Sequence, residues 1–272
     1  MLTMLLGLVM NPLWMTLCFN SVTHANICMM KKTGLYYHAW NETKDVFWAD
    51  PKTGLSPNFW TRAIGWYLMA LADIYGMIPD NRTDLIDEMA ALWKEAIDGM
   101  LRWQEKDSGL FYQLPALPNE KRNYLETSGS LMVAYSLLKG ARLDVLTEPE
   151  YRAAGEKILV GIELRKFTVH DGKVELHGIC KGAGLGPTGN LHRNGTVDYY
   201  LSEDVVHDEQ KGVCVCMMAY AEYLQAKQAG ALTDDFPKVE IFNKGYDPIM
   251  PGDPAFIAFE KDRAENAANK TR

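Results

Sequence analysis

A polar loop that changes abruptly into an apolar helix is the feature of this 272-residue sequence that most restricts its fold. Residues 50–75 read DPKTGLSPNFWTRAIGWYLMALADIY. Gly54 lies in a predicted turn, and Ser56 or Asn58 is expected to cap the first free amides of the helix. The residues that follow predict a helix that is apolar except at its beginning.

Three large side chains crowd the start of this helix, namely Trp60, Arg62 and Trp66. Arg62 and Trp66 are four residues apart, a spacing that makes side chains neighbours on a helix. A guanidinium offers a planar fork to a carboxylate, and indole faces stack on the C–H faces of sugar rings. The same trio also fits core packing with a salt bridge. On these residues alone both interpretations stay open.

A second aromatic segment lies just upstream. Residues 32–42 read KTGLYYHAWNE, in which a glycine turn precedes Tyr36, Tyr37 and Trp40 around a single histidine, His38. A histidine among aromatic residues is often structural. Two neighbouring loops that are both rich in aromatic residues and interrupted by glycine nevertheless predict one wall of a sugar pocket.

These segments carry a family resemblance. TGLYYHAW (33–40) followed by DPKTGLSPNFWTRAIGW (50–66) resembles the unsaturated rhamnogalacturonyl hydrolases of glycoside hydrolase family 105, which is related to family 88. RNYLETSGSLMVAYSLLKG (122–140) and YYLSEDVVHDEQKGVCVCMMAYAEYL (199–224) extend it. The resemblance therefore covers residues 33–224 and fails at both ends.

The resemblance implies an all-α fold, the (α/α)6 barrel or six-hairpin toroid. Twelve helices of roughly 15 residues with their loops need well over about 300 residues, so we expect an incomplete barrel here. The expected helices are 60–75, 84–106, 124–141, 148–167 and 211–227, with a short β-hairpin near 167–178. Recurrent turns at Gly34, Gly54 and Gly109 predict related connections on one face.

The chain is expected to divide into three parts. Residues 33–228 would form the C-terminal part of the barrel, and 229–272 a weakly structured tail. Residues 1–32 are expected to be aberrant or non-homologous, as in an out-of-frame translation joined to an authentic gene. Pro12 and the lack of charge argue against a signal peptide or membrane anchor in the first 22 residues.

The resemblance also implies a reaction, the hydration of the enol ether in 4,5-unsaturated uronyl oligosaccharides derived from pectin. An Asp protonates C4, water adds at C5, and the resulting hemiketal collapses and releases the neighbouring sugar. In the family this Asp precedes TGLYYH, whereas no acidic residue precedes Glu42 here. The general acid is therefore expected upstream of residue 1, and activity is expected to be impaired.

The remaining site residues match the family motif. The resemblance assigns Arg62 to the substrate carboxylate, Trp60 and Trp66 to ring stacking, and His38 to a hydroxyl or carboxylate contact. Glu126, at the start of a helix, could be a pocket acid, although a structural role is favoured.

Other ligands are not indicated by the sequence. No cofactor and no metal is expected, because Glu203, Asp204 and Asp208 near His207 lack convincing ligand spacing. His24, His170, His177 and His192 are scattered. The net charge of −7 comes from interspersed charges and gives no nucleic-acid footprint.

Five cysteines without a CxxC motif indicate reduced thiols and favour a cytoplasmic location, with a periplasmic one open if the native protein is exported. Two alternatives to a hydrolase remain at this point. One is a non-catalytic carbohydrate-binding module, and the other is a remnant without a stable fold. The sequence does not fix the oligomeric state.

Overall fold

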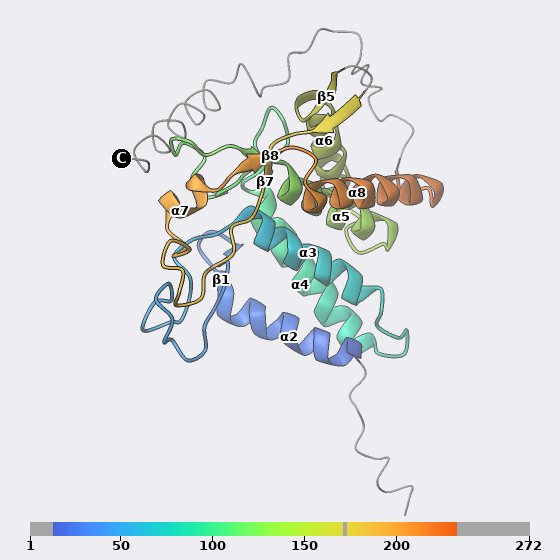
Figure 1. Cartoon of the computed structure of the whole chain (residues 1–272). Coiled ribbons are helices and arrows are strands. Elements are labelled where there is room, and N and C mark those ends of the chain that lie inside the picture. The colour runs from blue at the N-terminus through green and yellow to red at the C-terminus, as the bar shows by residue number, and fades with distance from the viewer. Residues whose placement is uncertain (1–12, 171–172, 233–272) are drawn as a thin grey trace, which may run out of the picture.

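The computed structural model describes residues 13–170 and 173–232, which form seven α-helices and four two-stranded antiparallel sheets (Figure 1). The helices are α2 (Leu13–Cys28), α3 (Thr61–Tyr75), α4 (Thr83–Leu101), α5 (Thr127–Arg142), α6 (Pro149–Arg165), α7 (Val197–Ser202) and α8 (Gln210–Gln228). The paired strands are β1 (Met29–Met30) with β2 (Leu35–Tyr36), β3 (Phe111–Tyr112) with β4 (Leu125–Glu126), β5 (Phe167–His170) with β6 (Lys173–Leu176), and β7 (Ile179–Cys180) with β8 (Val205–Val206).

Helix α5 is the centre of the core. Its sequence, TSGSLMVAYSLLKGAR, has small or apolar residues on all sides, the pattern of a fully buried helix. Leu131, Leu137 and Leu138 are completely buried, and the helix packs against α3, α6 and α8. The predicted all-α architecture is confirmed for the described residues, and the predicted hairpin is β5–β6.

Two helix boundaries differ from the predictions. The helix expected from residue 124 begins at Thr127, because Leu125 and Glu126 pair with β3 instead. The helix expected to reach residue 106 ends at Leu101. The predicted tail at 229–272 lies outside the described residues from 233 onward.

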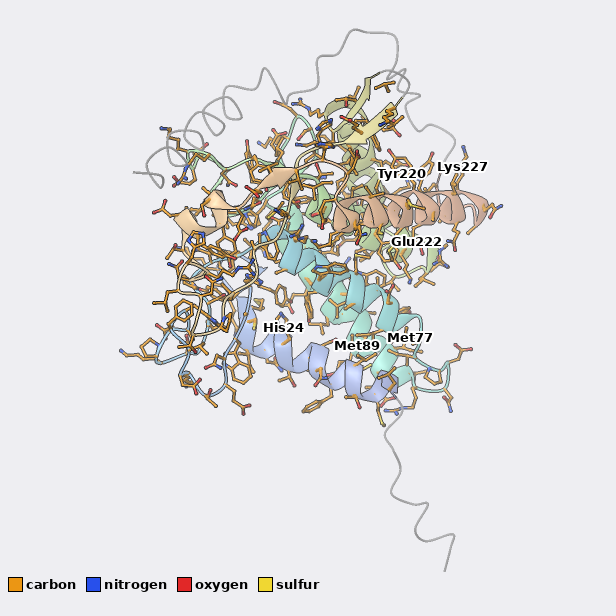
Figure 2. All side chains as sticks on the ribbon, viewed as in Figure 1. His24, Met77, Met89, Tyr220, Glu222 and Lys227 are labelled. Atoms are coloured by element: carbon orange, nitrogen blue, oxygen red, sulfur yellow. The ribbon has the colours of Figure 1, made fainter. Side chains whose placement is uncertain are left out.

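Helix α2 lies inside the segment 1–32 and was not expected from the sequence. It packs against α3 and α4 and buries Cys18 and Cys28. The ring of His24, marked in Figure 2, lies 4.7 Å from the ring of Tyr67 and 5.9 Å from that of Tyr36. The helix is therefore part of the folded unit, and the proposed boundary at residue 32 stays a prediction.

The recurrent glycine turns share one backbone conformation. Gly34, Gly54 and Gly109 have φ values of +71°, +80° and +75°, a left-handed region that favours glycine. Gly34 leads into β2, and Gly109 leads through Leu110 into β3. The repeated turn thus carries the chain into a short strand at Gly34 and Gly109, and at Gly54 into Leu55, which forms an isolated bridge with Trp40.

One of these turns sets a close contact that can be tested. A Cβ added to Gly161 of α6 would lie 2.0 Å from the carbonyl oxygen of Ser108, whereas one added to Gly155 of the same helix would lie 3.3 Å from Leu137 Cβ. We expect Gly161→Ala to lower the free energy of unfolding by about 2–3 kcal/mol despite the higher helix propensity of alanine. Gly155→Ala should change it by less than about 1 kcal/mol. Urea denaturation measures both, and equal effects would contradict the close approach.

Candidate active site

The predicted caps of α3 prove wrong. Trp60 occupies the N-cap position in an extended conformation and makes no side-chain cap bond. The Ser56 hydroxyl accepts from the backbone amide of Ala39 at 3.1 Å, and the Asn58 side-chain amide donates to the carbonyl of Gly195 at 2.8 Å. Both side chains therefore organise the loop that precedes the helix.

The first turn of α3 is instead held by β3 and the residue that follows it. The backbone amide of Thr61 donates to the carbonyl of Gln113 at 3.0 Å, and the Thr61 hydroxyl donates to the carbonyl of Tyr112. The buried Gln113 side chain also donates to the carbonyl of Tyr200 and accepts from the hydroxyl of Tyr124. This network fixes where α3 presents its first residues.

Arg62 points into the protein. Its side chain is buried, with only 1% of the residue exposed, and its Cζ lies 4.7 Å from the centre of the Trp60 ring. Nη1 donates to the carbonyl of Cys180 and to Ser128 Oγ, the latter at 3.2 Å. A buried guanidinium stacked on an indole gains from a cation–π interaction that water does not weaken.

Glu126 supplies the opposite charge. Its carboxylate is fully buried and accepts from the Ser128 amide (3.2 Å), the Ser128 hydroxyl (2.6 Å), the Gly129 amide (2.5 Å) and the Cys180 amide (3.0 Å). The Ser128 hydroxyl thus donates to Glu126 and accepts from Arg62. Glu126 is the N-cap of α5, which confirms its predicted place at a helix start.

His38, Trp60 and Tyr200 form an aromatic wall beside Arg62. His38 Nδ1 and the Tyr200 hydroxyl are 2.6 Å apart, and the His38 ring centre lies 4.8 Å from that of Trp60. The Trp60 and Tyr200 rings are 6.2 Å apart. We call His38, Trp60, Arg62 and Tyr200 the Arg62 site.

The Arg62 site suppresses protonation of its histidine. Burial, and then the charge of Arg62, lower the pKa of His38 to about 4. Burial raises the pKa of the Tyr200 hydroxyl. Near pH 7 the site therefore holds a neutral imidazole and a neutral phenol, and its positive charge comes from Arg62.

Several donors of the Arg62 site have no partner. Trp60 Nε1 is buried and makes no hydrogen bond within the described part of the chain. The hydrogen bonds of the Arg62 guanidinium all use Nη1, so Nε and Nη2 have no hydrogen-bond acceptor among the described residues. An unmet buried donor such as the Trp60 N–H is costly unless water or a ligand supplies an acceptor. Nε and Nη2 are also the edge of a guanidinium that binds a carboxylate with two parallel hydrogen bonds.

The structure brings together three of the four predicted site residues. His38, Trp60 and Arg62 are in contact, whereas Trp66 is 47% exposed. Four residues turn a helix by about 400°, so Trp66 is rotated by about 40° from Arg62 toward the edge of the buried face. The indole of Trp66 is therefore open to a ligand but is not part of the buried site.

Sequence reasoning missed Gln113, Cys180 and Tyr200. Tyr200 lies within the segment 199–224 that resembles the family, so the family resemblance could have identified it. Cys180 contributes only its backbone carbonyl and amide, and its residue type could not have predicted these contacts.

The family model of Glycosyl Hydrolase Family 88 matches residues 11–227. The chain belongs to this family. It is 40% identical over 195 residues to Protein Atu3128 of Agrobacterium fabrum, which covers 70% of this chain and 82% of that protein. It is 27% identical over 120 residues to the unsaturated rhamnogalacturonyl hydrolase YesR of Bacillus subtilis, covering 44% of this chain and 31% of YesR.

A solved structure supports the same assignment. The family 105 glycoside hydrolase of C. acetobutylicum ATCC 824 superimposes with a TM-score of 0.72 at 36% sequence identity. The match covers 76% of this family 88 chain and 57% of the solved one, so the chain spans little more than half of that relative. The six-hairpin barrel proteins of families 88 and 105 thus share this helical arrangement. In the described part of the chain, no helix has both the length and the apolar character that crossing a membrane requires.

Proposed function

We propose that this family 88 chain acts on pectin-derived oligosaccharides that end in a 4,5-unsaturated uronyl residue, and that the reaction is hydration of the enol ether. Family membership supports a carbohydrate substrate. The name of the relative YesR supports unsaturated rhamnogalacturonyl groups. The observation that carries the proposal is the buried Trp60 N–H without an acceptor beside a guanidinium that donates only through Nη1 among the described residues, a pair that suits an anionic, oxygen-rich ligand.

Each residue of the site has a role in this proposal. Arg62 binds the uronate carboxylate through Nε and Nη2, and the Trp60 N–H donates to a carboxylate or hydroxyl oxygen. Neutral His38, held by Tyr200, contacts a sugar hydroxyl. Trp66 gives an open indole face on which a sugar ring stacks. A buried guanidinium in surroundings of low polarity attracts a carboxylate strongly.

The chemistry needs a proton for C4 and a water for C5 of the unsaturated sugar. Glu126, the carboxylate nearest to Arg62 in the hydrogen-bond network, accepts four hydrogen bonds and is fully buried. Its oxygens are engaged in these bonds and it caps α5, so we give it a structural role. We therefore assign binding and orientation of the uronate to the Arg62 site and assign proton donation to none of its residues.

This assignment favours a second candidate, a carbohydrate-binding protein without catalysis. One experiment separates the two candidates. The chain is titrated calorimetrically with unsaturated rhamnogalacturonan disaccharide, and loss of the enol-ether absorbance is followed in the same samples. Binding with loss of absorbance supports the hydrolase, and binding without it supports the binding protein. Absence of binding overturns both.

A conservative substitution tests the unmet indole donor. Trp60→Phe keeps an aromatic ring beside His38 but removes the N–H, so we expect about a tenfold weaker affinity for the disaccharide, the loss of one hydrogen bond to a charged or polar acceptor. Trp103→Phe is the matched control, because its indole donates to the carbonyl of Thr33, which is not part of the Arg62 site. Calorimetry measures both affinities. Equal affinities for the two variants would remove Trp60 from the site.

A further inference from the structure

Two histidines and two carboxylates meet where the β5–β6 hairpin contacts the segment after β8. Glu175 lies on β6, His177 follows this strand, and His207 and Asp208 follow β8. We call these four residues the histidine–carboxylate cluster. One ligand atom each from Glu175, His207 and Asp208 lies within 4.8 Å of the others, and the ring centres of His177 and His207 are 5.4 Å apart.

The spacings in this cluster suit a metal ion. His207 Nδ1 lies 3.3 Å from Asp208 Oδ2, and His177 Nε2 lies 3.4 Å from Glu175 Oε2. Two ligand atoms that each lie about 2.0 Å from a tetrahedral zinc ion are about 3.3 Å apart. Both histidine–carboxylate pairs therefore already have the separation of neighbouring zinc ligands. Because the Glu175, His207 and Asp208 atoms all lie within 4.8 Å of one another, shifts of about 1 Å in these partly exposed side chains would bring the three to zinc-ligand distances.

The supporting contacts orient the ligands. Asp208 Oδ1 accepts from the backbone amide of Leu176 at 2.8 Å, and this leaves Oδ2 beside His207. The Asp208 amide donates to the Leu176 carbonyl at 2.9 Å, so this residue is fixed by two bonds. Second contacts of this kind set the orientation of ligand side chains in metal sites. His177 Nε2 lies 2.9 Å from Thr168 Oγ1, a contact that coordination through this nitrogen would replace.

The ligand set also selects the class of ion. Imidazole nitrogen with carboxylate oxygen suits zinc and the neighbouring transition metals, whereas calcium and magnesium prefer oxygen alone. Glu175 and Asp208 lie 3.4 and 3.3 Å from these imidazoles, and neither carboxylate forms an ion pair with a Lys or Arg among the described residues.

We propose that Glu175, His207 and Asp208 bind one divalent transition-metal ion, zinc in the first instance, with His177 as a fourth ligand. The ion would join β6 to the end of β8. Strand β7 pairs with β8 (Figure 1). It carries Cys180, whose carbonyl accepts from Arg62. The proposed ion would therefore stabilise the fold next to the strand pair that contacts Arg62. This proposal does not depend on the proposed reaction.

The test uses untagged full-length chain treated with a chelator and then titrated with Zn²⁺. A Cys214→Ser background removes the one exposed cysteine among the described residues, which could bind zinc itself. We expect one Zn²⁺ per chain and a rise in Tm of about 5 °C at a hundredfold excess of Zn²⁺ over the dissociation constant. His207→Ala and Glu175→Gln should each weaken binding at least about tenfold. His192→Ala, a change to an exposed imidazole outside the cluster, should bind as the background does.

Glu175→Gln keeps the shape of a partly exposed side chain and therefore carries the test if His207→Ala fails to fold. Zinc binding that is equally tight in Glu175→Gln and the background would overturn the proposal. The same conclusion follows if the background chain binds no zinc at a stoichiometry of one.

Discussion

Arg62→Met is expected to lower the free energy of unfolding by about 3 kcal/mol, because it leaves buried groups without their partner. Methionine fills a similar volume but donates no hydrogen bond. The Cys180 carbonyl and the Ser128 hydroxyl lose their donor, and the buried charge of Glu126 loses the cation that Ser128 links to it. Urea denaturation monitored by tryptophan fluorescence measures the change.

The same substitution at a surface pair is the matched control. Arg122 pairs at 3.0 Å with Asp198, whose side chain is 91% exposed, so Arg122→Met should cost less than about 1 kcal/mol. A double-mutant cycle with Glu126→Gln completes the test. Because Ser128 connects the two charged groups, we expect a coupling energy of about 1–2 kcal/mol. Strict additivity of the Arg62 and Glu126 changes would contradict the network.

Regular patterns made the helical part of the fold predictable. Apolar residues at helical spacing located α3, α4 and α8, and the alternation of apolar and polar residues around the sequence Asp171-Gly172 predicted the β5–β6 hairpin. The sequence did not reveal the short strands, because two-residue pairings such as β3–β4 and β7–β8 have no period that could be recognised. These strand pairs place the Gln113 carbonyl beside the Thr61 amide at the start of α3 and the Cys180 amide beside the Glu126 carboxylate.

The site residues that make their contacts through characteristic side chains could be predicted from the sequence. His38, Trp60 and Arg62 come together as predicted from their motifs, although their roles toward a substrate stay proposals. Gln113 and Cys180 act mainly through a buried amide and through backbone groups, which sequence patterns do not mark. The sequence analysis weighed Asp208 and His207 as metal ligands without Glu175, which lies 32 residues before His207. The pairing of β7 with β8 and the hydrogen bonds between Leu176 and Asp208 bring the two segments together.

The folded protein should lose stability in mild acid because of His38. Its pKa is about 4 in the folded chain, against the ordinary 6.5 of an unfolded histidine. Between these values the unfolded chain binds the extra proton, so the contribution of His38 is complete above about pH 6.5 and is lost progressively as the pH falls toward 4. The difference of two to three pKa units corresponds to about 3 kcal/mol at the acid end.

His38→Gln isolates this effect, because glutamine keeps a polar group for the Tyr200 hydroxyl but does not titrate. The free energy of unfolding is measured by urea denaturation at several pH values between about 7 and 4.5 for both proteins. Burial also lowers the pKa of His24 and His177, but both residues are present in either protein and cancel in the comparison. We expect the variant to lose about 2 kcal/mol less than the wild type over this range. Parallel curves would show that His38 accepts a proton as easily in the folded chain as in the unfolded one, and would remove the argument that Arg62 and burial keep this imidazole neutral.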